Sequence, residues 1–191
     1  MTSLEHRLRI TWRCVLFGSA LMLTSAVGQA GTYYVTTNGT GNGSAWDNSF
    51  GSIQAALNAI SNSIDTDATV FVAKTASPTY SSAVKVFGTS LTVRLYGGYN
   101  TNTSLRDGVS EIAFSGATNA LEIGTVGVSP VTNVGTFVVS DFKLNTGGIG
   151  LRSSKDATTF NYSYFIVSNS TITTTSAAFS AVSLGASTYF N

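Results

Sequence analysis

The sequence predicts an all-β solenoid, in which short strands stack as parallel sheets in successive coils and one amphipathic helix precedes the stack. Three observations lead to this fold class. The chain is rich in Ser, Thr, Asn, Gly and β-branched residues and has two prolines in 191 residues, a composition that favours strands and tight turns over helices. One segment of the second half recurs further along the chain. A single window shows a helical apolar period.

The repeat gives the period of the coils. Residues 137–144 ("FVVSDFKL") align without a gap on residues 165–172 ("FIVSNSTI"). Upstream, Ile112 and Phe114 precede Phe142 and Leu144 at nearly the same spacing. A second short apolar strand follows each stretch, at residues 120–124, 148–151 and 178–184. A period of roughly 28 to 30 residues with two strands per unit and no helix indicates a β-solenoid. Chance similarity within a Ser- and Thr-rich chain is the alternative.

The N-terminus has the layout of a secretory signal peptide. Arg7, Arg9 and Arg13 precede an uncharged, mostly apolar stretch, and "GQA" places small residues before a cleavage site after Ala30. We therefore expect residues 1–30 to be a signal peptide and the mature protein to be secreted or displayed at the cell surface. The alternative is an uncleaved membrane anchor, although the apolar stretch is shorter than the roughly 20 residues that a spanning helix needs.

Removal of the signal peptide restricts the chemistry of the mature chain. His6 and Cys14 are the only His and Cys residues, and both lie before Ala30. Ser-His-Asp triads, Cys nucleophiles, His- or Cys-ligated zinc sites and disulfides are therefore excluded for residues 31–191. These residues contain seven Lys and Arg against eight Asp and Glu. Because no basic face is available to neutralise phosphates, we expect no nucleic-acid partner.

The first expected elements are a strand at residues 32–37, a Gly- and Asn-rich turn at residues 38–46, and an amphipathic helix at residues 51–64. The apolar residues of the helix recur at three- and four-residue steps and share one stripe: Ile53, Ala56, Leu57, Ile60 and Ile64. Ser49 or Ser52 is the candidate N-cap. Since a stack of coils exposes an apolar end, we expect this helix to cap it.

Two further strands follow the helix. Residues 68–74 ("ATVFVAK") have the composition of a buried strand, and residues 90–98 ("SLTVRLYGG") alternate between two faces. The inner face would carry Leu91, Val93 and Leu95, and the outer face Thr92, Arg94 and Tyr96. Gly97 and Gly98 in "LYGGYN" would form a sharp corner, because glycine adopts positive φ without strain. The flanking tyrosines would cover this bend.

These segments carry a family resemblance. "GTYYVTTNGTGNGSAWDNSFGSIQAALNAI", "TVFVAK" and "LYGGYNTNTSLRD" resemble, in that order, the N-terminal region of secreted bacterial right-handed parallel β-helix proteins of the pectate-lyase-like superfamily. The resemblance implies a right-handed parallel β-helix with its cap and first coils at residues 31–107 and further coils at residues 108–191. One departure is "KTASPTYSS", a longer loop where the family has Gly-Thr-Tyr. We expect the β-helix to be truncated at its C-terminus, or to be the N-terminal piece of a longer surface protein.

The resemblance also implies candidate site residues. Enzymes of this superfamily cleave acidic polysaccharides, the lyases with an Arg or Lys base and calcium held by carboxylates. Asp65 and Asp67 are the candidate calcium ligands, unless they belong to a polar loop. Arg94 and Arg106 are the candidate ligand-binding bases, unless each makes a local ion pair or a hydrogen bond at a corner. "NTG" at residues 145–147 lacks the acid of the hydrolase "NTD", which disfavours glycosidase chemistry.

Other polar and aromatic residues have structural interpretations. Tyr162, Tyr164 and Phe165 are candidates for sugar stacking, although a strand accounts for them as core and edge residues. Side-chain ladders at coil corners are the expected role of Ser140, Asn145, Ser168 and Asn169.

The sequence thus favours a non-catalytic, monomeric scaffold or adhesin-like β-helix that binds a polysaccharide or cell-surface glycan, with no catalytic residues and no cofactor. One alternative is a calcium-dependent polysaccharide lyase whose active site lies largely outside this chain. The other is a fragment without independent function.

Overall fold

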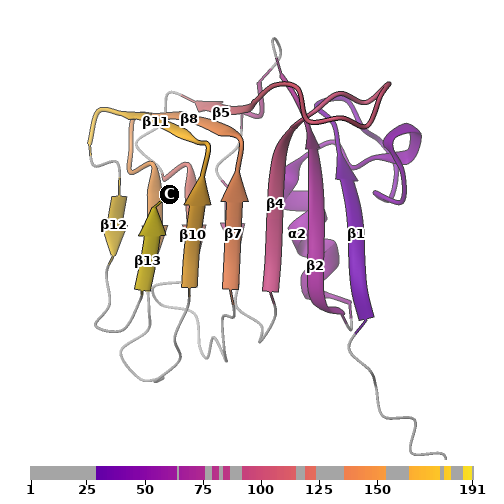
Figure 1. The fold of residues 1–191 in the computed structure, drawn as a ribbon, viewed down its shortest axis with the longest axis horizontal. Helices are drawn as coiled ribbons and strands as arrows, with labels where there is room; N and C mark the ends of the chain where they lie inside the picture. The colour runs from indigo at the N-terminus through magenta and orange to yellow at the C-terminus, as the bar shows by residue number, and fades with distance from the viewer. Residues whose placement is uncertain are drawn as a thin grey trace, which may run out of the picture.

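The computed structural model describes residues 29–63, 65–75, 79–81, 84–86, 92–114, 119–123, 136–153, 164–176, 179–181 and 187–190. The predicted signal peptide lies outside these residues except for its last two. The described part is mainly β, with parallel sheets and one short α-helix (Figure 1). Among the helices of this part, none is long and apolar enough to cross a membrane.

Three sheets contain the described strands, and every strand pair in them is parallel. Sheet A has the order β1 (Gln29–Val35), β2 (Asp65–Ala73), β4 (Thr92–Tyr99), β7 (Thr136–Ser140), β10 (Tyr164–Ser168) and β13 (Ser187–Phe190). Sheet B has the order β11 (Thr171–Thr174), β8 (Phe142–Thr146) and β5 (Ser110–Phe114). Sheet C has the order β12 (Phe179–Ala181), β9 (Leu151–Ser153), β6 (Leu121–Ile123) and β3 (Val84–Val86).

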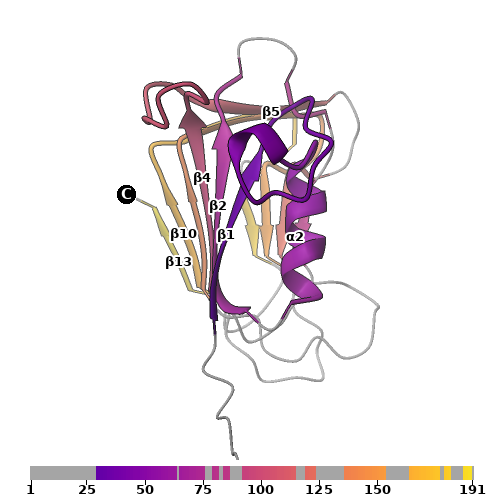
Figure 2. The same ribbon diagram turned by 90° about the vertical axis from the view of Figure 1, so that its right-hand side faces the viewer.

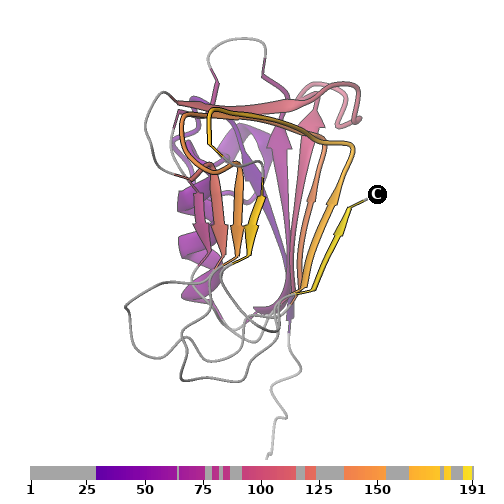
Figure 3. The same ribbon diagram turned by 90° about the vertical axis from the view of Figure 1, so that its left-hand side faces the viewer.

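From β4 onward the chain visits the three sheets in rotation, so that β7, β8 and β9 are followed by β10, β11 and β12 in the same sheets. In Figure 1 the strands of sheet A stand side by side with their arrows in one direction. Figure 3, viewed along the sheets, shows the short strands of sheet C across the interior from sheet A. Each unit of the repeat therefore contains three strands, and the prediction of two was wrong.

The extra strand arises because residues 137–144 are two strands rather than one. β7 ends at Ser140 and β8 begins at Phe142, with Asp141 between them at φ 63°. Asn169 occupies the equivalent position between β10 and β11 at φ 46°. Asp and Asn adopt the left-handed region more readily than other non-glycine residues. A single residue in this conformation turns the chain from one sheet into the next.

The predicted register of the repeat is confirmed. Val139 pairs with Val167 and Leu144 with Ile172, both in parallel ladders and both at the sequence separation that the alignment gave. The upstream equivalence was wrong by two residues, because Ile112 pairs with Leu144 rather than with Phe142. The parallel ladder between β5 and β8 defines which residues are equivalent. The segments between the strands differ in length from one repeat unit to the next, so a constant sequence spacing did not give this pairing.

The core lies between the sheets and consists mainly of aliphatic side chains from all three. Helix α2 (Ile53–Ser61) packs its buried residues Ile53, Ala56, Leu57 and Ile60 against it. Figure 2 shows α2 beside β1 and β2 on the inner side of sheet A. The Ser52 side chain accepts a hydrogen bond of 3.1 Å from the amide of Ala55 and so caps the helix. The helix ends before Ile64, which lies outside the described residues.

The "LYGGYN" segment differs from its prediction in one respect. β4 continues through both glycines to Tyr99, and the chain reverses afterwards, where Tyr99 and Arg106 form an antiparallel bridge. Gly98 has a φ of 78°, as expected for a glycine at a bend. A Cβ at Gly97 would collide with the carbonyl of Asp141. The glycines therefore allow the close approach of two neighbouring repeat units at the end of β4.

Candidate functional site

The outer face of sheet A carries a row of aromatic side chains. Tyr34 of β1, Phe71 of β2 and Tyr96 of β4 pair in register across the three strands. All three are half-buried, whereas their strand neighbours Val35 and Leu95 are fully buried in the core. Because successive side chains of a strand point to opposite faces, this row must lie on the side away from the core.

Two further aromatic residues complete a concave surface. Trp46 lies 4.9 Å from Tyr34 between ring centroids, and Tyr99 lies 4.8 Å from Phe71. Two further ring contacts join these pairs: the centroids of Trp46 and Tyr99 are 5.9 Å apart, and those of Tyr34 and Phe71 are 5.6 Å apart. These four rings surround what we call the aromatic recess, a cavity of about 320 Å³ lined by Tyr34, Ala45, Trp46, Phe71, Tyr99 and Ser104.

Two loops hold the rim of the recess. The loop after β1 returns alongside the strand, with hydrogen bonds of 2.9 Å from the Tyr34 amide to the Gly43 carbonyl and from the Phe50 amide to the Tyr34 carbonyl. The loop after β4 places Ser104 at φ 55°, where its hydroxyl accepts a hydrogen bond of 3.1 Å from Nε1 of Trp46. A non-glycine residue held in this region marks a conformation that its surroundings enforce.

Arg106 lies beside the recess and covers the aromatic row. Its guanidinium carbon is 4.9 Å from the ring centroid of Tyr96 and 5.8 Å from that of Tyr99. The same guanidinium forms an ion pair with Asp141 and donates a hydrogen bond of 3.0 Å to the Ser140 hydroxyl. Partial burial raises the pKa of Tyr99, although the charge of Arg106 acts in the opposite direction. Tyr99 is therefore neutral at physiological pH.

The structure places the other predicted site residues in separate local interactions. Arg94 and Asp67 form an ion pair across β4 and β2. Asp65 instead accepts a hydrogen bond of 2.6 Å from the hydroxyl of Tyr33, whose pKa is raised by desolvation and by this bond. Asp65 and Asp67 thus have different partners. Among the residues that the structure describes, no group of three or more His, Cys, Asp or Glu side chains could hold a metal ion.

The remaining candidates lie away from the recess or outside the described residues. Asn145 is exposed on β8, and Asn169 is exposed at its corner. Ser140 donates a hydrogen bond of 2.7 Å to the neighbouring Asp141, and the predicted side-chain ladder stays a prediction. Tyr162 lies outside the described residues, and Tyr164 and Phe165 belong to β10, where the structure does not describe their side chains.

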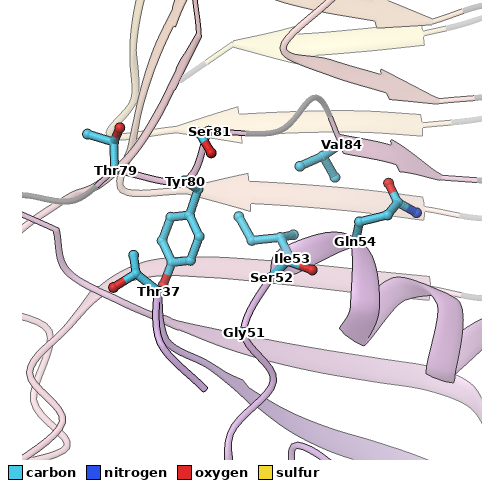
Figure 4. Close-up of a pocket in the computed structure, with 9 residues that line it drawn as sticks. All are labelled: Thr37, Gly51, Ser52, Ile53, Gln54, Thr79, Tyr80, Ser81 and Val84. Atoms are coloured by element: carbon cyan, nitrogen blue, oxygen red, sulfur yellow. The ribbon is translucent and has the colours of Figure 1, made fainter. Parts of the chain in front are cut away.

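A second cavity lies where the start of α2 meets the segment at residues 79–81 (Figure 4). Tyr80 is one of its lining residues, and the Tyr80 hydroxyl donates to the carbonyls of Val35 and Ala73 at 3.3 and 3.4 Å. Burial raises the pKa of Tyr80. The cavity measures about 90 Å³, which corresponds to the liquid volume of roughly three water molecules. It is therefore too small for a sugar ring.

A third hollow is a broad groove beside the first residues of β1, between the loop that follows β1 and the segment that joins α2 to β2. It is lined by Ala30–Tyr33, Asn42–Ser44, Asn62, Ser63 and Asp65. Its walls are mostly small side chains and polar groups, and Tyr33, whose ring also packs against Phe50 at 6.4 Å between centroids, is the single aromatic residue that lines it. Of these three hollows in the described part of the chain, the aromatic recess is lined by the most aromatic residues.

Sequence reasoning did not find the aromatic recess. The signal was present in part, because Tyr34, Phe71 and Tyr96 occupy alternate positions of strands whose other face is apolar. Trp46 could not be added from the sequence, since it reaches the recess through a loop conformation that depends on contacts between distant segments. Tyr99 could not be added either, because it follows the two glycines at the end of β4, where the alternation of faces is broken.

Comparison with known proteins gives no relative: no protein-family model, no curated protein and no solved structure matches this chain.

Proposed function

We propose that this protein is a secreted or cell-surface right-handed parallel β-helix of the pectate-lyase-like kind that binds glycan through the aromatic recess, without catalysis. The rotation of the chain through three parallel sheets supports the β-helix part of the proposal. Right-handed crossovers are the rule between parallel strands. The pairing of β7, β8 and β9 with β10, β11 and β12 at one constant sequence spacing supports stacked, equivalent coils.

The observation that carries the binding role is the aromatic recess itself. Ligand sites are typically concave, mostly apolar and supplied with a few fixed polar groups. Four aromatic residues line the recess, and the hydroxyls of Tyr34, Tyr99 and Ser104 belong to lining residues. Tyrosine and tryptophan combine an apolar face with a polar tip, which suits sugars, since they present both C–H faces and hydroxyl groups.

The ion pairs near the recess favour a binding role over lyase activity. Each candidate base already has an acidic partner, Arg94 with Asp67 and Arg106 with Asp141. Lys74 likewise pairs with Asp107 at 2.8 Å, and this contact lowers the pKa of the Asp107 carboxyl. Because these charges are mutually compensated, the surface beside the recess has no excess of positive charge to attract an acidic polysaccharide.

The test is affinity electrophoresis of the full protein in gels that contain neutral or acidic polysaccharides, with calcium or a chelator. We expect retardation by a neutral glycan, loss of retardation in Trp46→Ala, and no effect of calcium. Asn145→Ala, an exposed change on sheet B, is the matched control and should behave as the wild type. Equal retardation of wild type and Trp46→Ala by every glycan would refute the site. Calcium-dependent release of unsaturated uronides would establish the lyase alternative instead.

A further inference from the structure

We infer that removal of the signal peptide after Ala30 creates a partner for Asp65: the new α-ammonium group of Gly31 forms an ion pair with the Asp65 carboxylate and holds the start of β1 against β2. This inference rests on the export that the proposed function includes, and it is independent of the aromatic recess. The site lies in the groove beside the first residues of β1, which Ala30, Gly31, Tyr33 and Asp65 help to line.

The Asp65 carboxylate lies very close to the backbone of Gly31. A Cβ on Gly31 would collide with Oδ2 of Asp65, and it would be 2.9 Å from Cγ of Asp65 and 2.7 Å from Cε2 of Tyr33. Carbon atoms that are not bonded to each other pack at about 3.5–4.0 Å. The carboxylate can therefore take this position because residue 31 is a glycine. The hydroxyl of Tyr33 holds it there through the hydrogen bond of 2.6 Å.

Asp65 has acceptor capacity left and no cationic partner in the described part of the chain. A carboxylate offers about four lone-pair sites, and the Tyr33 hydroxyl uses one of them. The ion pairs that the described residues form involve other carboxylates, among them Asp67, which pairs with Arg94. Asp65 is half-buried. Because an opposite charge nearby stabilises an ionised group, a cation at Gly31 would stabilise this carboxylate.

Hydrolysis by a signal peptidase supplies that cation. One water molecule is added across the amide between Ala30 and Gly31, which leaves a carboxylate on the released peptide and an α-amino group on Gly31. An α-amino group loses its proton only near pH 8, so it is mostly charged at neutral pH. In the precursor the same nitrogen belongs to a neutral amide. The ion pair therefore exists only in the processed protein.

The terminal nitrogen can reach the carboxylate without a shift of the strand. Gly31 pairs with Ala68 of β2, and the residues of β1 after it pair with β2 in one register, so the ladder holds the Cα of Gly31. Rotation about the Cα–C bond of Gly31 moves the freed nitrogen towards the position that a Cβ would occupy, which is beside Asp65. A charge-assisted hydrogen bond of about 2.7–2.9 Å can form there. It would offset the pairing that β1 loses with Gln29 and Ala30.

The experiment uses the full chain, expressed with its own residues 1–30 in a bacterial host. Intact mass and N-terminal sequencing of the exported protein should show Gly31 as its first residue. Limited acetylation at pH 7, followed by mass spectrometry of the N-terminal peptide, then measures how often the α-amino group is free. A partly exposed ion pair favours the charged form by a factor of up to about five, so Asp65→Asn should react roughly two- to fivefold faster than the wild type.

Two comparisons show whether the contact itself is responsible. Asp67→Asn removes the neighbouring carboxylate, which pairs with Arg94, and should leave the rate unchanged. In Gly31→Ala the methyl group displaces the carboxylate, so the further change Asp65→Asn should make no difference to the rate.

Equal rates for the wild type and Asp65→Asn would overturn the inference. A mature protein that begins at another residue would also overturn it, and in that case export, and with it the proposed function, would stand. A chain that stays inside the cell with residues 1–30 attached would refute export, and the inference would fall with it. Retardation by glycans tests the aromatic recess separately, because Asp65 is not among the residues that line it.

Discussion

The inner and outer faces of sheet A follow different rules. The inner row across β2, β4, β7 and β10 consists of Val70, Leu95, Val139 and Val167, all buried. The outer row, one residue along, starts with Tyr34, Phe71 and Tyr96 and continues with Ser140 and Ser168. The inner row is uniform because every repeat unit must fill the same interior. The outer row changes from aromatic to hydroxyl side chains although the backbone is the same.

This difference teaches where function can be encoded in such a sheet. Core packing restricts the inner residues of each strand to apolar side chains of similar size, whereas the outer residues meet only solvent and their neighbours. The first three strands use this freedom for the aromatic recess, and β7 and β10 carry serines at the equivalent positions. Changes on the two faces should therefore have effects of different kinds and sizes.

The largest loss of stability is expected where helix α2 packs against the inner face of sheet A. Leu57 of α2 is 5% exposed and packs into the core. Leu57→Asp would bury an unpaired carboxylate, which costs several kcal/mol and is a large part of the total stability of a domain. Urea denaturation should show this loss, whereas Asn58→Asp, the same charge on the exposed side of the helix, should be nearly neutral. Equal midpoints for the two variants would mean that α2 does not close the core.

A smaller effect should separate the two faces of a single strand. Val139 is fully buried, and Val138, its neighbour on β7, is half-buried on the outer face. Removing two methyl groups at Val139 leaves a cavity, so Val139→Ala should lower the free energy of unfolding by about 2 kcal/mol. Val138→Ala makes the same chemical change on the outer face and should cost less than half as much. A reversed order would show that the register of β7 has been assigned to the wrong face.

The smallest effect concerns the aromatic row itself. Tyr96→Ser would give β4 the outer residue of β7 and would remove the contacts with Phe71, at 6.5 Å between centroids, and with Arg106. Ring pairs and exposed cation–π contacts each contribute on the order of 1 kcal/mol, so thermal denaturation should reveal only a modest loss. Ser168→Ala, at the equivalent half-buried outer position of β10, is the control and should leave the melting temperature nearly unchanged. A collapse of the fold in Tyr96→Ser would mean that the aromatic row is structural.

Much of the fold could be predicted from the sequence because the relevant signals are local. The helix followed from the apolar stripe that includes Ile53 and Leu57, and Ser52 was one of its two candidate caps. β2 and β4 followed from alternating or continuous apolar residues. The pairing of Val139 with Val167 followed from the alignment of two segments of the same length. In each case the residues that make the signal lie within one element or one repeat.

The candidate site was harder to predict from the sequence than the fold. Arg94 and Arg106 were selected as free bases or local ion pairs, and the structure pairs them with Asp67 and Asp141, which lie on other strands or corners far away in the sequence. Asp65 and Asp67 stand two residues apart, yet they have different partners. Partners that are so distant along the chain are set by which strands become neighbours in sheet A.

The sequence by itself therefore determined the β-rich class, the amphipathic helix, the inner face of the strands and the register of the repeat, since hydrophobic period and repeat are written along the chain. Tertiary structure decided the rest. The third strand of each unit depends on Asp141 and Asn169 in the left-handed region, which a contiguous apolar pattern does not reveal. The aromatic recess depends on two loops, joined by the bond from Trp46 to Ser104. These residues meet only because parallel strands far apart in sequence lie side by side in one sheet.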